Sequence, residues 1–324
     1  MTLYRRHFLR LSAAAAGGLL MPPIAAAQTY PSRPVRLLIG FTPGGPVDLV
    51  ARLMADALAE RLGQAFLLEH RPGAGGNLAA EAVIRSIPDG YTLFMTSPAA
   101  AINQTLYPNL SFNFARDSAP VGGIVRLANV LLVHPSVPAT TVPELIAFVK
   151  ANPGKLNFGA ATGTSLHLSA ELLKLMTGAQ IMHVPYKGAG PALTDLLGGQ
   201  IQMMFNAAPL SVEYMRSGKL RALGVTSATR LPLLPEVPPI AEYLPGYEVS
   251  NWYGVVAPKD TPRGVVSRLN QAIQDSLRDP KIRGRLVEMG GTLLEGSPQD
   301  FGQFVADETE KWSKVVKFAG LKAQ

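Results

Sequence analysis

The chain has 324 residues, of which 47% are apolar and 16% are charged, and it contains no cysteine. The length accommodates two domains of ordinary size, and the apolar content excludes a disordered chain. The lack of cysteine excludes a disulfide scaffold, a zinc finger, a thiol nucleophile and a lipid-anchored bacterial lipoprotein. The formal net charge of +7 is spread along the chain without a basic run, so nucleic acid is not an expected partner.

Residues 1–27 are predicted to be an export signal peptide. Arg5 and Arg6 precede a short apolar segment at residues 11–21, and three alanines at positions 25–27 provide the small residues of a cleavage site. The apolar segment is about half as long as the ~20 residues of a membrane span. The arginine pair is similar to the twin-arginine motif, but Tyr4 stands where Ser or Thr is usual, which leaves the twin-arginine and general secretion routes both open. The mature chain is therefore expected in the periplasm.

Short apolar runs alternate with helical patterns along the mature chain, which is typical of a parallel α/β fold. The first set has predicted strands at residues 35–39, 66–69 and 91–96 and predicted helices at residues 47–62 and 78–85. Gly63 is placed to cap the C-terminus of the first helix. The second set has predicted helices at residues 142–151 and 166–176 and predicted strands at residues 156–159, 182–185, 201–205 and 220–225.

Two further segments, residues 129–133 and 252–256, are predicted to be strands that cross between the two sets. The C-terminal part of the chain adds two helices, with start signals at Thr261 and Ser297, and only one strand. It must therefore pack back on the first set. The sequence predicts two lobes, made of residues 28–125 with 227–324 and of residues 126–226, with the ligand site in the cleft between them.

The loop after the first predicted strand, residues 40–48, is rich in glycine and leads into a helix. Such a loop lets main-chain N–H groups approach an anion, and the helix dipole adds about half a positive charge. A tight turn without binding is an equally good explanation, because Pro43 and Pro46 remove two donors. Asp48 would repel an anionic ligand unless it holds a water or a loop amide.

Further loops follow other strands, at the sheet edge where ligands bind in open α/β folds. Residues 96–101 end a strand with two hydroxyl groups, as the lip of a cleft would. Ser165 is expected to cap the next helix, either while also donating its hydroxyl group to a ligand or as a cap alone. His167 is expected to face its own helix or to form a structural hydrogen bond. Lys187 is either an ammonium group for an acidic ligand or a solvated surface lysine.

Motifs of enzyme chemistry are missing from the sequence. It has no nucleophile elbow, phosphate-binding P-loop or zinc-protease helix motif, and its histidines show no metal-ligand spacing. Residues 71–77 are rich in glycine, but Leu78 stands where the last glycine of a dinucleotide fingerprint belongs. We therefore expect no catalytic residue, no metal and no cofactor, and a periplasmic hydrolase stays a remote alternative.

A series of short strings stands at residues 30–35 (YPSRPV), 43–48 (PGGPVD), 71–77 (RPGAGGN), 88–92 (PDGYT), 184–188 (VPYKG) and 192–200 (ALTDLLGGQ). In this order, and over essentially the whole mature chain, they resemble the Bug-type periplasmic solute-binding receptors of tripartite tricarboxylate transport systems. The resemblance implies a type II periplasmic-binding-protein fold, in which two doubly wound lobes, joined by two crossover strands, close around a small organic carboxylate.

The resemblance also implies that main-chain amides and bound waters hold the carboxylate, with little use of arginine. The binding residues carried over are Phe41, Thr42, Gly44, Gly45, Asp48, Ser97, Ala101, Gly163, Thr164, Ser165 and Asn206. Relatives commonly have aspartate at the position of Asn206, and an amide offers donors where a carboxylate has only acceptors. We therefore expect Asn206 to suit a ligand with an additional anionic or acceptor group, and unchanged affinity in Asn206→Asp would remove this hypothesis.

The partners that the resemblance implies are the ligand and a membrane transporter. A monomeric receptor would deliver its carboxylate to the large and small membrane components of a tripartite transporter. A receptor of the same fold that reports the solute to a signalling kinase is the alternative, and the sequence leaves it open.

Overall fold

The computed structural model describes residues 30–318, 320 and 321. The chain separates into two units, Met1–Ser32 and Arg33–Gln324, and every element named below belongs to the second. The predicted signal peptide, residues 1–27, lies outside the described residues. None of the helices within the described ranges is long and apolar enough to cross a membrane.

The first strand set is parallel, with β1 hydrogen-bonded to β2 on one side and to β3 on the other. Its elements are β1 (Val35–Ile39), α2 (Pro46–Leu62), β2 (Phe66–His70), α3 (Asn77–Ile84) and β3 (Thr92–Thr96). Leu37, Leu38 and Ile39 are all buried, as expected for a strand covered on both faces. The predicted cap of α2 is confirmed, since Gly63 is left-handed with φ 71° and its amide donates to the carbonyl of Ala59.

The second strand set repeats this plan around β5, which pairs in parallel with β6 and β7. Its elements are α6 (Val142–Ala151), β5 (Asn157–Ala160), α7 (Ser165–Thr177), β6 (Met182–Pro185), α8 (Ala189–Leu197), β7 (Met203–Ala207), α9 (Val212–Arg216) and β8 (Arg221–Val225). Each strand and helix predicted for this set is present, some with ends shifted by one or two residues. The helices α8 and α9 have no predicted counterpart.

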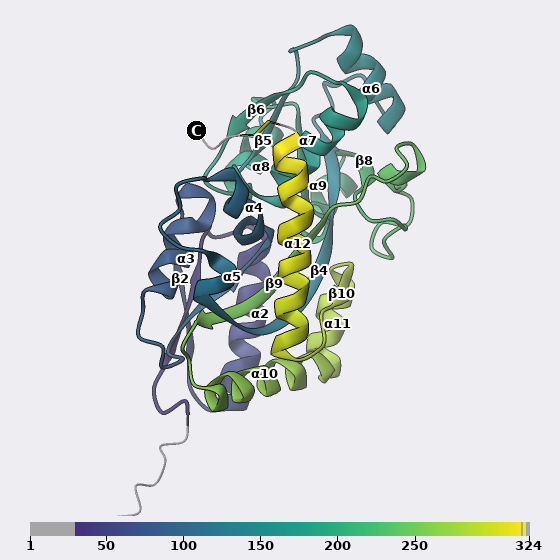
Figure 1. The fold of residues 1–324 in the computed structure, drawn as a ribbon. Coiled ribbons are helices and arrows are strands. Elements are labelled where there is room, and N and C mark those ends of the chain that lie inside the picture. The colour runs from purple at the N-terminus through teal and green to yellow at the C-terminus, as the bar shows by residue number, and fades with distance from the viewer. Residues whose placement is uncertain (1–29, 319, 322–324) are drawn as a thin grey trace, which may run out of the picture. The chain divides into compact units, whose positions relative to one another are not determined.

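Two long strands, β4 (Ser118–Val133) and β9 (Ser250–Pro258), join the sets. The strand order is β2-β1-β3-β9-β4-β7-β5-β6, with β8 and β10 also paired to β4. Figure 1 shows both long strands running between the two sets. Their pairings with β3, β7, β8 and each other are antiparallel, so the sheet is parallel only within each set. The predicted crossovers at residues 129–133 and 252–256 are confirmed as parts of these longer strands.

The C-terminal part differs from its prediction. It contains α10 (Arg263–Arg278), α11 (Pro280–Glu288), β10 (Gly291–Leu293) and α12 (Pro298–Phe318). The expectation of one strand in the last hundred residues, the crossover that is now part of β9, was wrong, because β10 is a second strand and pairs with β4 in antiparallel register. Three residues are too few to show a strand pattern. Thr261 does not cap α10, since its hydroxyl group donates to the carbonyl of Pro258. Ser297 does cap α12, in a reciprocal pair with Asp300.

Two helices between β3 and β4 were not predicted, α4 (Pro98–Leu106) and α5 (Phe114–Asp117). The long helix α12 packs against α4 and β4, and Figure 1 shows it lying across the crossover strands. The indole N–H groups of Trp252 on β9 and Trp312 on α12 both donate to the Glu308 carboxylate, each at 2.9 Å. This buried contact fixes α12 to the strand that leads to the cleft.

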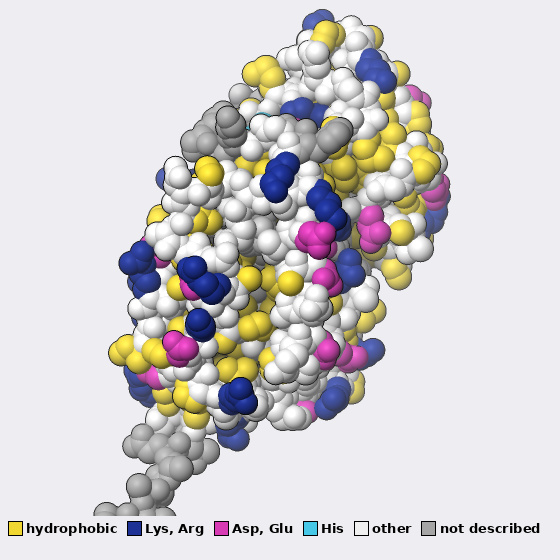
Figure 2. All heavy atoms as spheres, in the orientation of Figure 1, with side chains coloured by type: hydrophobic (Ala, Val, Ile, Leu, Met, Phe, Trp, Pro, Cys, Tyr) yellow, Lys and Arg dark blue, Asp and Glu magenta, His cyan; other side chains and the backbone are white. Residues whose placement is uncertain are grey.

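The two-lobed α/β fold is therefore as expected. The lobe boundaries, at residues 125/126 and 226/227, stay a prediction. On the face drawn in Figure 2, basic and acidic side chains are interspersed and neither sign forms a continuous patch.

Candidate ligand-binding cleft

A cavity of about 40 Å³ lies between the two lobes. Among the described residues, the first residues of four helices line it: α2 and α4 from the first lobe, and α7 and α8 from the second. The lining residues are Phe41, Gly45, Pro46, Val47, Ser97, Pro98, Ala161, Thr164, Ser165, Leu166, Gly188, Ala189, Asn251 and Tyr253. Each helix N-terminus carries roughly half a positive charge and amides without a helical partner. Four of them together make the cavity attractive to an anion.

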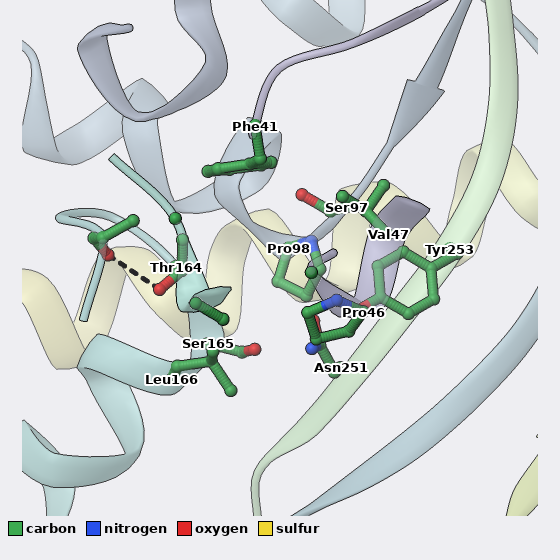
Figure 3. Close-up of a pocket in the computed structure, with 14 residues that line it drawn as sticks. Phe41, Pro46, Val47, Ser97, Pro98, Thr164, Ser165, Leu166, Asn251 and Tyr253 are labelled. Carbon is green, nitrogen blue, oxygen red and sulfur yellow. Dashed lines mark hydrogen bonds between the residues drawn. The ribbon is translucent and has the colours of Figure 1, made fainter. Parts of the chain in front are cut away.

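Hydroxyl groups supplement these amides. Figure 3 shows the side chains of Ser97 and Ser165 reaching into the cavity from opposite sides. Ser165 is 1% exposed, and its hydroxyl oxygen has no hydrogen-bond partner among the described residues. The helix cap of α7 is Thr164, whose hydroxyl oxygen accepts from the amide of His167 at 3.3 Å. The capping role considered for Ser165 was therefore wrong, and its hydroxyl group makes no hydrogen bond within the described part of the chain.

Asp48 lies buried in the first turn of α2 and holds the β1–α2 loop. Its carboxylate accepts from the amide of Gly44 at 3.0 Å and from Arg52 at 3.0 Å, and it contacts the His70 ring at 2.8 Å. Burial alone would raise the pKa of Asp48, but the hydrogen bonds from Gly44, Arg52 and His70 outweigh it and lower that pKa. Asp48 thus holds the amide of Gly44. A contact of this kind is the condition, set out from the sequence, under which Asp48 would not repel an anionic ligand.

No lysine, arginine or histidine is among the described residues that line the cavity. Arg52, on the helix that follows the β1–α2 loop, is already engaged by Asp48. The described residues also contain no cluster of three acidic or histidine side chains that could hold a metal ion. The chemistry that the cavity offers is therefore backbone amides and hydroxyl groups.

Five of the eleven predicted binding residues line this cavity: Phe41, Gly45, Ser97, Thr164 and Ser165. The other six, Thr42, Gly44, Asp48, Ala101, Gly163 and Asn206, are not among its lining residues. Gly44 is the amide that Asp48 holds, and Ala101 is buried in α4. The amide of Gly163 donates to Nδ1 of His167 at 3.3 Å, so His167 forms the structural hydrogen bond that was expected of it.

Asn206 lies at the end of β7 and is fully buried. Its amide nitrogen donates to the hydroxyl oxygen of Ser211 at 3.2 Å, while its amide oxygen has no partner among the described residues. The side chain does not line the cavity.

Glycines let loops from the two lobes touch. A Cβ atom added to Gly188, at the start of α8, would collide with the hydroxyl oxygen of Thr42 in the β1–α2 loop. One added to Gly163 would collide with the amide oxygen of Asn103 on α4. The hydroxyl oxygen of Thr42 is buried without a hydrogen-bond partner among the described residues. The two lobes are therefore in contact at positions that admit glycine and no larger residue.

Asn251 and Tyr253, on the crossover strand β9, line the cavity without having been predicted. Burial raises the pKa of Tyr253 well above its ordinary value, although Asn251 hydrogen-bonds to it, so Tyr253 stays neutral. No loop motif marks these positions. The only signal was the prediction that this strand crosses between the lobes, since a crossover passes the floor of the cleft.

Comparisons with known proteins give the class. Residues 50–321 match the family described as "Tripartite tricarboxylate transporter family receptor". The protein BugT of Bordetella pertussis is 37% identical over 312 residues, which cover 95% of each chain. A UPF0065 protein from the tcbD-tcbE intergenic region of a Pseudomonas species is 37% identical over 292 residues, covering 89% of this chain and 87% of the relative.

Solved structures of periplasmic binding proteins are also similar to this chain. Rpa4515 of R. palustris, solved with adipate, has a TM-score of 0.87 at 40% identity, covering 90% of this chain and 99% of its own. The periplasmic binding protein BugD has a TM-score of 0.87 at 33% identity, covering 91% and 100%. MatC of Rhodopseudomonas palustris, solved with bound malate, has a TM-score of 0.84 at 33% identity, covering 89% and 100%.

The fold and the cavity between helix N-termini define a two-lobed solute-binding protein, a class of receptors and not of enzymes. Within this class, the chain belongs to the receptor family of the tripartite tricarboxylate transporters, to which the Bug proteins are similar. The resemblance noted in the sequence is thereby confirmed.

Proposed function

We propose that this chain is exported to the periplasm, captures a small organic carboxylate in the cavity between its lobes, and delivers it to the membrane components of a tripartite transporter. The observation that carries the proposal is the convergence of four helix N-termini on one cavity. Two similar structures, solved with adipate and with malate, support a carboxylate as the ligand.

The amides are sufficient for binding without an arginine. A hydrogen bond to a charged group contributes about 1.5–3 kcal/mol net. Four such bonds contribute roughly 6–12 kcal/mol, compared with the ~8 kcal/mol of a micromolar dissociation constant. Association and lobe closure offset part of this gain. The proposal therefore expects a dissociation constant of about micromolar size.

We assign binding roles by position. The cavity-lining residues Phe41, Gly45, Ser97, Thr164 and Ser165 would contact the ligand, whereas Asp48 would shape the loop that presents the amides. The amide nitrogen of Asn206 uses one N–H group on Ser211, and its second N–H group could donate to a bound water or to the ligand. Because Asn206→Asp removes this donor, the substitution is expected to change the affinity for a carboxylate.

A thermal-shift screen of mono-, di- and tricarboxylates on the mature chain, followed by titration calorimetry, tests capture. Because a ligand that binds only the folded receptor raises its melting temperature, at least one acid should shift the transition. If every acid leaves the transition in place, the proposal is wrong.

Delivery needs a cellular test. Uptake of the radiolabelled acid that calorimetry identifies should fall when the gene for this chain is deleted, and should return when it is restored. Normal uptake in the deletion strain would contradict delivery and would favour the sensing alternative.

A further inference from the structure

The long strand β4 changes its partners near its C-terminal end. Up to Ala128 it pairs with β9, and from Asn129 onward it pairs with β7 and β8. Thr226, the residue after β8, bridges this changeover, because its hydroxyl oxygen accepts from the amide of Asn129 at 2.9 Å and its hydroxyl group donates to the carbonyl of Val249 at 2.5 Å. Asn129, Thr226 and Val249, which we call the junction, are fully buried. The junction therefore ties β4 to the segment that leads into β9.

The helix α7 is held by the same segments. Its first residue, Ser165, lines the cavity, and Ser169 lies one turn further along and is fully buried. The hydroxyl oxygen of Ser169 accepts from the side-chain amide of Asn129 at 3.4 Å, and its carbonyl oxygen accepts from the hydroxyl group of Tyr247 at 2.8 Å. Asn129 belongs to the junction, and Tyr247 lies two residues before Val249. Both segments of the junction thus contact α7 at a single residue.

This contact reaches the cavity through the first turn of α7. The hydroxyl group of Ser169 donates to the carbonyl of Ser165 at 2.8 Å, so it binds the main chain of the residue that lines the cavity. The hydroxyl group of Ser165 and the first amides of α7 are donors for a ligand. A displacement of Ser169 would therefore move these donors relative to Asn251 and Tyr253, which β9 places at the same cavity.

The side chain of Tyr247 is fixed in its surroundings. It is fully buried, and its ring lies nearly parallel to that of Phe205 on β7, with the ring centroids 6.4 Å apart and the planes at 24°. Burial raises the pKa of Tyr247 well above its ordinary value. The hydroxyl group therefore stays protonated and remains a donor to the carbonyl of Ser169.

We propose that Ser169 and Tyr247 are positioning residues, which hold the ligand-binding end of α7 in place against the two long strands that join the lobes. Neither residue is among those that line the cavity, so each acts on the ligand through Ser165 and the first amides of α7. This inference rests on the proposed function and adds to it two buried residues, outside the cavity, that determine the affinity for the ligand.

The test is titration calorimetry of Ser169→Ala and Tyr247→Phe. The probe is whichever of hexanoate, adipate, malate and citrate binds the wild-type chain most tightly. Each substitution removes one hydroxyl group and keeps the rest of the side chain. Thermal unfolding gives a temperature at which both variants are folded, so that a loss of stability alone leaves the dissociation constant unchanged. We expect each dissociation constant to rise about three- to tenfold, which corresponds to one hydrogen bond.

The matched control for Ser169 is Ser276 on α10. Ser276 is also fully buried, its hydroxyl group donates to the carbonyl of Ala272 at 2.7 Å, and its hydroxyl oxygen accepts from Nε of Arg61 at 3.0 Å. Ser276→Ala thus removes the same kind of contact at a position away from the junction. It should lower the melting temperature and leave the dissociation constant at the wild-type value.

A second measurement asks whether the effect passes through the end of α7. Tyr247→Phe should raise the dissociation constant less in a Ser165→Ala chain than in the wild type, because the hydroxyl group that it would misplace is already absent. An equal rise in both backgrounds would overturn the inference. Wild-type dissociation constants in both Ser169→Ala and Tyr247→Phe would also overturn it, and in either case the proposed function stands. If none of the four acids binds the wild-type chain, the proposed function fails and this inference fails with it.

Discussion

The carboxylate of Asp48 accepts a hydrogen bond from the backbone amide of Gly44 at 3.0 Å. This contact ties the first turn of α2 to the loop before it, so an acidic residue beside an anion site presents the loop instead of repelling the ligand. Arg52 donates to the same carboxylate oxygen, and the His70 ring contacts the other oxygen at 2.8 Å.

Removing this carboxylate should lower both the stability of the folded chain and its affinity for a carboxylate ligand. Asp48→Ala is expected to lower the free energy of unfolding by about 1–2 kcal/mol, because a buried hydrogen-bonded carboxylate is lost. The dissociation constant for the best carboxylate should rise as well, since the loop amides are no longer held. Urea unfolding and calorimetry measure the two effects. Asp56→Ala, an exposed aspartate on the same helix, is the matched control, and equal effects of the two substitutions would contradict this role.

The same carboxylate makes stability depend on acidity. The pKa of Asp48 is lower in the folded chain than its ordinary value of 3.8, so its contribution is present above that pH and is lost as the pH falls through the folded-state pKa. Asp48→Asn should therefore lose less stability than the wild type between neutral pH and pH values below 3.8. Urea midpoints at the two ends of this range measure the difference, and parallel losses would show that Asp48 is not responsible.

His167 should make the free energy of unfolding depend on pH over a higher pH range than Asp48 does. Burial, followed by the charges of His183 and Lys174, lowers the pKa of His167 from 6.5 to about 3. Between these values the unfolded chain is protonated at this position and the folded chain is not, so acidification costs up to about 1.4 kcal/mol per pH unit. In His167→Gln the free energy of unfolding should fall less steeply over this range. An unchanged slope would mean that His167 titrates alike in both states.

Lobe contact should depend on Gly188. In Gly188→Ala the added methyl group collides with Thr42, so closure around a ligand is hindered and the dissociation constant should rise by about tenfold or more. Gly190→Ala is the matched control, because its Cβ atom would lie 3.5 Å from the carbonyl of Pro43, an ordinary contact. Thr42→Ala in the Gly188→Ala background should restore part of the affinity. A dissociation constant of Gly188→Ala equal to that of the wild type would contradict the role of this contact in closure.

The buried carboxylate of Glu308 should be a stability determinant. In Glu308→Leu the indole N–H groups of Trp252 and Trp312 lose their shared acceptor, and each buried donor left unpaired costs about 1–3 kcal/mol. Glu308→Gln keeps an acceptor oxygen and should cost less. Glu310→Gln, an exposed position on the same helix, should change little. Thermal unfolding measures all three, and equal effects of the leucine and glutamine variants would contradict the shared acceptor.

Local signals explain what the sequence predicts well. The strand at Val35–Ile39 is a continuous apolar run that ends at a glycine loop, and α2 has both a first-turn proline, Pro46, and a capping glycine, Gly63. Each of these signals acts within a few residues of the element that it defines. The four loops that meet at the cavity could also be predicted, because parallel strands place their following loops on one edge.

The features that the sequence does not predict depend on contacts between segments that are distant in the chain. Nothing near Gly188 in the sequence indicates that Thr42 will lie against it, and Tyr253 lines the cavity only because β9 crosses between the lobes. The three residues of β10 become a strand through pairing with β4. Ser165 was considered as a helix cap because the sequence does not separate it from its neighbour Thr164, which takes that role.

The central claim is that the cavity recognises negative charge through helix N-termini and hydroxyl groups. It is tested most directly by titration calorimetry of the mature chain with its best carboxylate and with the primary amide of the same acid. Loss of two charge-assisted hydrogen bonds should weaken the amide by about a hundredfold or more. Equal affinity for the acid and its amide would contradict the account.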